Sequence, residues 1–296
     1  MKKTTLIITS VLVVCAASMT AYAQAKASED SPSLLYKVTG KGLAQPSYIF
    51  GTFHAICSSE MVPFEKLDTY LTQSDQLMME IDMDDAVEMG SMGKALIIPD
   101  GKTIKDFMTA EQFAKVDAMI TNLLGYSAEN VKMVKPSMLM VLAVTSPKAI
   151  GCTPTIYDLS LMQNAVAKKK PVVGLETVAS QIKVIDSKPL DKQAKDLYEM
   201  AADPEKSIKE LKKMMAVYKA GDAEKLFELT ESMMTSDKEF QSRLLDERNI
   251  AWIPKLEAAF KEKPTFVAVG AGHLGGKNGV IKLLRKNGYK VTTVKL

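Results

Sequence analysis

The sequence predicts an α/β protein with a central mixed β-sheet built from N- and C-terminal strands and a largely helical middle region that forms a cap. Runs rich in β-branched and aromatic residues occur within residues 33–55 and 264–296, and a further apolar run lies around residue 172. Helical apolar spacing dominates between these runs, and no internal repeat interrupts the pattern. We therefore expect one folded unit.

The N-terminal elements follow from turn and periodicity signals. Residues 33–55 contain two β-rich runs around a Gly/Pro turn, which predicts a hairpin whose second strand ends at Gly51. Helical spacing over residues 63–75 predicts a helix. The segment "QLMMEIDMD" (76–84) predicts a short apolar strand that runs into acidic residues.

Helical patterns cover most of residues 104–146, 156–170 and 178–262, and Pro171 starts the strand "PVVGLET". At the C-terminus, "PTFVAVGAGH" (264–273) predicts a strand. It is followed by the helix "GVIKLLRKNG" with a glycine at its end and by a last strand, "YKVTTVKL".

The first 23 residues have the features of a Sec-type export signal. Two lysines precede an apolar stretch that is too short to span a membrane, and Ala21-Tyr22-Ala23 fits a small-x-small cleavage site. We expect a flexible mature N-terminus over residues 24–32 and a single domain over 33–296, with a helical insertion at about 104–262. The mature protein is expected to be soluble and either periplasmic or secreted.

Charge and cysteine content limit the function classes further. Removing residues 1–23 leaves 36 basic against 35 acidic side chains, a balance that gives no electrostatic case for binding nucleic acid or an anionic membrane. Cys57 and Cys152 remain, and in an oxidising compartment this even count favours a disulfide over two buried thiols. The sequence does not indicate an oligomeric state.

The stretch "VAVGAGHLGG" (267–276) has two incompatible interpretations. Gly270-x-Gly272-x-x-Gly275 spells a dinucleotide-binding fingerprint, which requires an acidic residue about 20 positions further on. None of the 21 residues after Gly275 is Asp or Glu, so this interpretation fails. In the other interpretation, a Gly-x-x-His turn presents the imidazole of His273.

The chain contains only two histidines, and both follow an apolar run in the spacing Gly-x-x-His: Gly51 precedes His54, and Gly270 precedes His273. We attribute the glycines to a sharp backbone turn at each strand end. Two further predicted strands end in Glu80 and Glu176. Because open α/β sheets bind ligands at the carboxyl ends of their strands, these four side chains predict a catalytic divalent-metal site.

These motifs, together with "LMMEID", "YDLSLMQNAVAKKKPVVGLET", "DERNIAWIPKLE" and "FVAVGAGHLGGKNGVIKLLRKNGYKV", resemble the TraB/GumN family. That family is related to Tiki metalloproteases and is thought to share ancestry with erythromycin esterase and haem-binding ChaN-like proteins. The resemblance covers residues 33–296. It implies metal-dependent peptide hydrolysis, with His54 and His273 as metal ligands and Glu80 as an essential residue.

Two helical residues have alternative roles. Arg248 is either a catalytic residue that holds a substrate carboxylate or an oxyanion, or an exposed helical arginine. Asp158 either caps the helix that follows it, which we favour, or orients a histidine.

The leading hypothesis is an exported metallohydrolase, specifically a peptidase, acting on a peptide or small-molecule substrate. Its Mn, Co, Fe or Zn ion is held by His54, His273 and one of Glu80 and Glu176, while the other glutamate activates water. The alternatives are a non-catalytic periplasmic protein that binds a metal or haem, and a structural protein whose histidines are turn residues.

Overall fold

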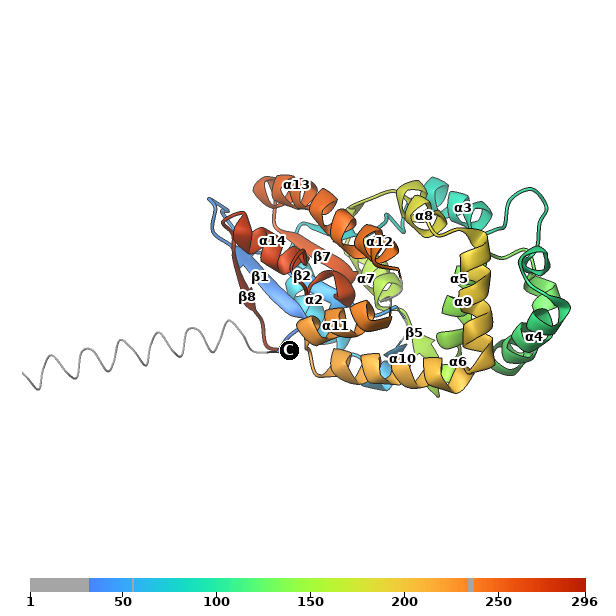
Figure 1. Ribbon diagram of the computed structural model, residues 1–296. Helices are drawn as coiled ribbons and strands as arrows, with labels where there is room; N and C mark the ends of the chain where they lie inside the picture. Colours follow the sequence, from blue (N-terminus) through green and yellow to red (C-terminus); the bar gives the residue numbers. More distant parts are fainter. Residues whose placement is uncertain (1–31, 55, 234–236) are drawn as a thin grey trace, which may run out of the picture.

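The computed structural model describes residues 32–54, 56–233 and 237–296 of the chain (Figure 1). The predicted export signal at residues 1–23 and nearly all of the predicted mature N-terminus lie outside the described residues. The α/β architecture predicted from the sequence is confirmed, because a mixed sheet built from N- and C-terminal strands is combined with a helical middle region.

A six-stranded sheet with the order β6-β4-β7-β2-β1-β8 forms the centre of the fold. Its strands are β1 (Leu35–Thr39), β2 (Ser47–Thr52), β4 (Gln76–Met79), β6 (Val172–Gly174), β7 (Thr265–Gly270) and β8 (Lys290–Thr293). A separate two-stranded sheet pairs β3 (Ile56–Cys57) with β5 (Pro154–Thr155).

The strand directions explain the sequence patterns. The strands β6, β4, β7 and β2 are parallel neighbours, whereas β1 pairs antiparallel with both β2 and β8. Every residue of β2 is buried, as are all but the last of β7, and continuous apolar runs are typical of parallel strands covered on both faces. Because β7 lies between β4 and β2, the C-terminal part of the chain completes the middle of the sheet.

Most helices of the described chain lie between β4 and β7, whereas the first of them precedes β4 and the last follows β7. They are α2 (Phe64–Thr72), α3 (Ala86–Ala95), α4 (Ala110–Leu124), α5 (Pro136–Val144), α6 (Pro147–Ile150), α7 (Tyr157–Ala167), α8 (Val178–Asp186), α9 (Leu190–Ala202), α10 (Pro204–Lys219), α11 (Ala223–Met233), α12 (Lys238–Gln241), α13 (Glu247–Glu262) and, after β7, α14 (Val280–Lys286). Short 3-10 turns lie at Ser58–Glu60, Ile104–Phe107, Ala128–Val131 and Ala271–His273, and a π-helical turn spans Ser242–Asp246.

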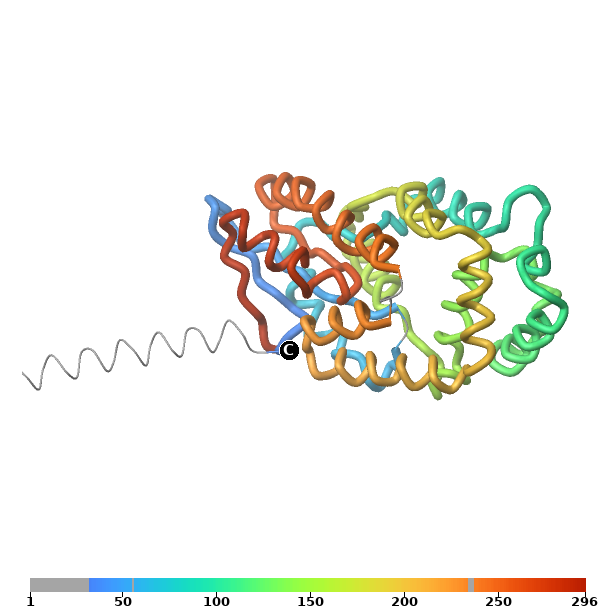
Figure 2. The backbone as a smooth tube through the Cα atoms, viewed as in Figure 1, coloured from blue at the N-terminus to red at the C-terminus, as the bar shows by residue number. Residues whose placement is uncertain are grey.

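The helices pack into two separate hydrophobic cores. The larger core joins the sheet to α2, α7, α13 and α14. The second core unites α4, α5, α6 and α9, so these helices form a distinct helical part. In the backbone trace, α8 and α10 connect this helical part to the sheet from opposite sides (Figure 2).

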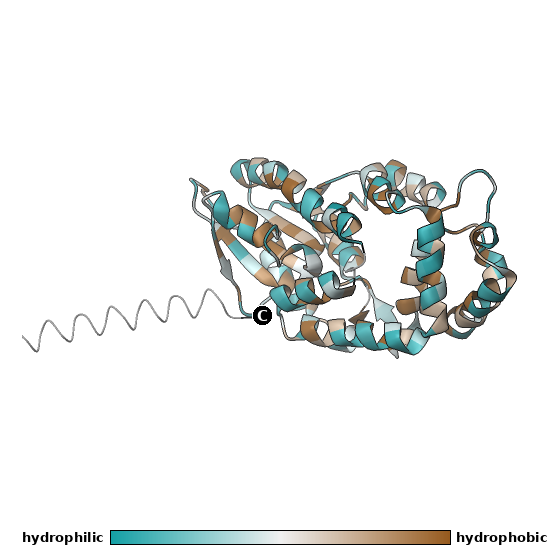
Figure 3. Cartoon of the chain, in the orientation of Figure 1, coloured by the Kyte–Doolittle hydropathy of each residue, from teal (hydrophilic) through white to brown (hydrophobic). Residues whose placement is uncertain are grey.

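The surface helices carry the expected two-sided pattern. Hydrophobic and hydrophilic residues alternate around α10 and α13 (Figure 3), because one face of each helix packs inward and the other meets solvent. None of the helices in the described part of the chain is long and apolar enough to cross a membrane.

The expected disulfide is present between Cys57 and Cys152, with the two Cα atoms 5.8 Å apart. It lies beside the β3–β5 pair, where Cys57 is opposite Pro154. The bridge therefore joins the segment that follows His54 to the segment that leads into α7.

Candidate functional site

Four neighbouring parallel strands end at the four side chains that the sequence singled out. In the order β6, β4, β7, β2, the carboxyl ends lead to Glu176, Glu80, His273 and His54. This spatial order differs from the order along the chain, since β7 inserts between β4 and β2. The sheet topology thus places residues from distant segments along one edge, where open α/β sheets bind ligands.

The two glycines of the Gly-x-x-His motifs leave space for neighbouring side chains and do not have a backbone conformation that needs glycine, so the predicted reason for them was wrong. Neither Gly51 nor Gly270 has a positive φ. A Cβ atom on Gly51 would lie 2.6 Å from a side-chain carbon of Leu274. A Cβ atom on Gly270 would lie 3.2 Å from Glu80 Oε1 and 4.0 Å from His54 Nε2. The absence of a side chain at residue 270 leaves room at the centre of the site.

Arg248 lies among the site residues and is buried, which excludes the interpretation as an exposed helical arginine. Its Nε donates to Glu176 at 3.0 Å, and Nη2 donates to Glu176 at 2.6 Å and to Glu80 at 2.5 Å. Its Nη1 donates to the Leu244 carbonyl at 2.9 Å and lies 3.1 Å from His273 Nε2. All five N–H groups of the guanidinium therefore have acceptors within the protein.

The helix that carries Arg248 has a local irregularity directly before it. Residues Ser242–Asp246 form a π-helical turn, in which the Glu247 N–H bonds to the Ser242 carbonyl five residues back. Such turns occur frequently at functional sites. Here the Leu244 carbonyl within the turn accepts a bond from the side chain of Arg248, which helps to hold the guanidinium in the site.

His273 is buried, and its neighbours define its tautomer. Arginine has no acceptor, so Nε2 of His273 must accept the hydrogen bond from Arg248. Nδ1 then carries the proton and donates to Asn249 Oδ1 at 2.6 Å. Asn249 in turn donates through Nδ2 to the carbonyl oxygen of Asn278, and the Trp252 ring packs 4.5 Å from the imidazole. Burial lowers the pKa of His273 to about 3, so the ring is neutral at neutral pH.

Glu80 is held in its ionised form. Burial alone would raise its pKa, but His273, the Arg248 guanidinium and the Gly270 N–H, which donates at 2.8 Å, outweigh this effect. The pKa of Glu80 is lowered to about 2. Because His273 is neutral at neutral pH, the positive charges that act on this carboxylate are Arg248 and the protonated His54.

Glu176 contacts the same guanidinium from its other side. Its Oε1 accepts from both Nε and Nη2 of Arg248, and its Oε2 lies 3.3 Å from Nε. Gln181 donates to Glu176 and to Glu80 at 3.2 Å each. The two glutamates therefore share a cation and an amide, but Glu80 is the one that faces His273, with 3.8 Å between Oε1 and Nε2.

His54 is in a different environment, because 72% of its side chain is exposed. Its Nδ1 lies 3.6 Å from Asp158 Oδ2, a buried oxygen without a hydrogen-bond partner in the described part of the chain. The other carboxylate oxygen of Asp158 accepts from Thr52 at 3.0 Å. Asp158 raises the pKa of His54 to about 9.

The capping role favoured for Asp158 was wrong. Asp158 lies in the first turn of α7, but no side chain caps this helix end by a hydrogen bond. Its carboxylate points instead at His54 and Thr52, where it can orient the imidazole.

The donor types fit a divalent metal ion, but the present arrangement is not that of a bound ion. Among residues 32–54, 56–233 and 237–296, no group of three or more His, Cys, Asp and Glu side chains is arranged to hold a metal. Two donors of one ion can lie up to about 4.2 Å apart, so His273 and Glu80 are close enough to share one. The guanidinium of Arg248 contacts both of them.

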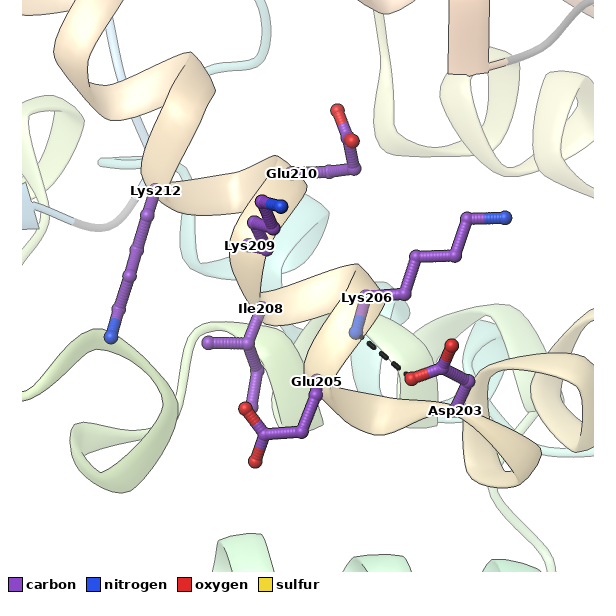
Figure 4. Close-up of a pocket in the computed structure, with 7 residues that line it drawn as sticks. All are labelled: Asp203, Glu205, Lys206, Ile208, Lys209, Glu210 and Lys212. Atoms are coloured by element: carbon purple, nitrogen blue, oxygen red, sulfur yellow. Dashed lines mark hydrogen bonds between the residues drawn. The ribbon is translucent and has the colours of Figure 1, made fainter.

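A separate hollow of about 530 Å³ lies along α10 and is lined by Asp203, Glu205, Lys206, Ile208, Lys209, Glu210 and Lys212. Figure 4 shows mostly charged side chains of both signs on one helix, with Asp203 bonded to the Lys206 backbone N–H at the helix start. None of the candidate residues lines this hollow, and its balanced charges are typical of a solvated helix face.

Sequence reasoning missed Asn249, Gln181 and Thr52, which position His273, the two glutamates and Asp158. For Asn249 the only available signal was its place next to Arg248. The contacts of Gln181 and Thr52 depend on how α8 and α7 pack against the sheet, and no local pattern encodes this packing.

The fold and the site together define a class of α/β proteins with a His, Glu and Arg centre at the carboxyl edge of a mixed sheet. The sequence model of the TraB/PrgY/gumN family matches residues 34–293, and the chain belongs to this family.

Several curated relatives carry a protease name. The chain is 23% identical over 326 residues to "Metalloprotease TIKI2" of Xenopus tropicalis, covering 90% of this chain and 60% of that protein. It is 21% identical over 306 residues to "Metalloprotease TIKI1" of Danio rerio, covering 83% of this chain and 60% of that protein. The chain thus spans about 60% of the length of these relatives. No solved structure gives a significant match.

Proposed function

We propose that the chain is an exported metal-dependent hydrolase that cleaves peptides, with a divalent ion held by His54, His273 and Glu80. One observation carries the proposal: four neighbouring parallel strands lead to two imidazoles and two carboxylates at one edge of the sheet. The protease names of the distant relatives supply the reaction class.

The contacts of each residue support its proposed role. Glu80 is preferred over Glu176 as the metal ligand because it faces His273 at 3.8 Å. Glu176 accepts hydrogen bonds from two nitrogens of Arg248, so we assign to it the positioning of this arginine. Asn249 holds His273 so that Nε2, the nitrogen without a proton, faces the site, and Asp158 orients His54.

A bound divalent ion supplies a polarised carbonyl and a water of lowered pKa. Mixed nitrogen and oxygen donors suit Mn, Co, Fe or Zn. Axial haem ligation by both histidines is less well supported, because His273 is buried against the Trp252 ring.

Metal content tests the site. Elemental analysis of the purified protein should find one divalent ion per chain, and His54→Ala and His273→Ala should each lose most of it. The matched control is Lys66→Ala, an exposed change on α2. Equal metal content in wild type and both histidine variants would rule out the proposed ligands.

Peptide cleavage tests the reaction. A peptide library should be cut by the loaded protein, cleavage should stop after chelation, and one added metal should restore it. Glu80→Gln should abolish cleavage, whereas Asp84→Asn, an exposed change close by, should not. Metal binding without any cleavage would instead identify a non-catalytic metal-binding protein.

Export is supported by the disulfide, which is typical of oxidising compartments. Cell fractionation should find the protein in the periplasm or the medium, and N-terminal sequencing should begin at Gln24. A cytoplasmic protein with an intact N-terminus would overturn this part of the proposal.

A further inference from the structure

Arg248 contacts both side chains that a metal ion would need, His273 through Nε2 and Glu80 through Oε2. Its Nη1 lies 3.1 Å from His273 Nε2, and its Nη2 lies 2.5 Å from a Glu80 oxygen. Its positive charge is permanent, because the guanidinium does not lose its proton in proteins. A second cation at this place must compete with it.

The hydrogen bonds of His273 mean that Arg248 and a metal ion cannot use its ring at the same time. Nδ1 carries the proton and donates to Asn249, so Nε2 has the single lone pair available to a metal. Arg248 uses this lone pair. The ring cannot turn over to offer Nδ1 without breaking the 2.6 Å bond to Asn249, whose amide is itself held by the Asn278 carbonyl.

We propose that Arg248 is the resident cation of the metal-free site and that a divalent ion binds by displacing the guanidinium from His273 Nε2 and from Glu80. This inference rests on the proposed function, since it assigns His273 and Glu80 as ligands. It makes Arg248 a determinant of metal affinity, a role that differs from binding the substrate.

The displaced arginine stays in the site. Glu176 is not a proposed ligand, so its side chain can move with the guanidinium and keep its bonds to Nε and Nη2. Displacement breaks two hydrogen bonds of Arg248. The N–H of Nη1 that pointed at His273 and the N–H of Nη2 that pointed at Glu80 are then without an acceptor. Metal loading thereby releases two N–H donors beside the ion, which can then bind the carbonyl oxygen of a substrate.

Metal affinity of an arginine variant tests this inference. Isothermal titration calorimetry with Zn²⁺ and Mn²⁺ should show that Arg248→Met binds at least about tenfold more tightly than wild type, because its buried carboxylates are left uncompensated until an ion arrives. The metal-free variant should also melt at a lower temperature, and metal should raise its melting temperature more than that of wild type. The control is Arg243→Met, which removes a surface arginine paired with Glu239 and should change neither quantity.

The outcomes separate the two proposals. If wild type binds metal and Arg248→Met binds it equally or more weakly, the competition is overturned while the metal site stands. If neither binds metal, the proposed function fails and the inference fails with it.

Two further measurements test the proposal even if Arg248→Met does not fold. Arg248→Lys keeps one positive charge but has three donors in place of five, so it should bind metal with an affinity between wild type and Arg248→Met. In wild type, nitrogen NMR should show that Zn²⁺ changes the environment of the Arg248 side-chain nitrogens. Unchanged Arg248 signals at saturating zinc would overturn the displacement.

Discussion

His54 and His273 follow the same Gly-x-x spacing but have opposite chemical states in the metal-free protein. His54 is exposed beside a carboxylate, which favours its protonated form. His273 is buried against Trp252 and Arg248, and its neutral form is favoured. A motif of four residues therefore presents the ring, while residues far away in sequence decide its charge.

This difference predicts the titration of the two imidazoles. In metal-free protein, NMR should find one imidazole with a pKa near 9 and one that stays neutral down to about pH 3. The assignment is simple, since the chain has two histidines. Asp158→Asn should lower the pKa of His54 and weaken metal binding by about 10–100-fold. Two imidazoles that both titrate near 6.5 would contradict the described contacts.

A side chain added at Gly270 tests whether the metal ion occupies the space beside this residue. Gly270→Ala should fold, because its φ of −51° suits alanine, but the new Cβ atom would lie 3.2 Å from Glu80 Oε1. We expect metal affinity to fall by about tenfold or more, with a stability loss of about 1–3 kcal/mol. Titration calorimetry and chemical denaturation measure the two effects.

The comparison is Gly93→Ala in α3, where a Cβ atom meets open space. This change should leave metal affinity as it is and should not lower stability. Normal metal binding by Gly270→Ala would mean that the ion does not occupy the space beside Gly270.

At the scale of elements, the sequence predicts the strands and their carboxyl ends well, because continuous apolar runs are a local signal. It therefore identifies His54, Glu80, Glu176 and His273 as residues of one edge. The contacts of Arg248 and Asp158 were not predictable, since they depend on which helix faces point at the sheet. The π-helical turn before Arg248 likewise has no clear local signature.

The β3–β5 pair and its disulfide lie close to His54 along the chain, and we expect them to position this residue. The bridge lies three residues after His54 and six residues before Asp158, and Ser58 and Thr155 also contact each other across the pair. Removing the bridge in Cys57→Ser/Cys152→Ser should cost about 2–5 kcal/mol of stability in chemical denaturation. It should also weaken metal binding through His54.

Reduction by dithiothreitol should reproduce both effects in wild type and should change nothing in the double variant. If metal affinity stays constant while stability falls, the bridge stabilises the fold without positioning His54.

At the scale of the whole molecule, the buried charges make stability depend on pH. The pKa of Glu80 is lower in the folded state than its ordinary value of 4.5, so its ionic contacts stabilise the fold above about pH 4.5 and are lost as the pH falls toward 2. Melting temperatures of metal-free protein should fall across this window, and less steeply in Glu80→Gln. Glu65→Gln on the exposed face of α2 should follow the wild-type slope. Identical slopes for wild type and Glu80→Gln would contradict the charged cluster.

The central place of β7 has a consequence for how the protein is made. A ribosome-bound chain that lacks residues 265–270 can pair β4 with β6 and β1 with β2, but no other strand of the described sheet joins these two pairs. The proposed ligand set, too, stays incomplete until His273 has been synthesised. The proposed site can therefore form only after β7 and the turn that carries His273 have been translated.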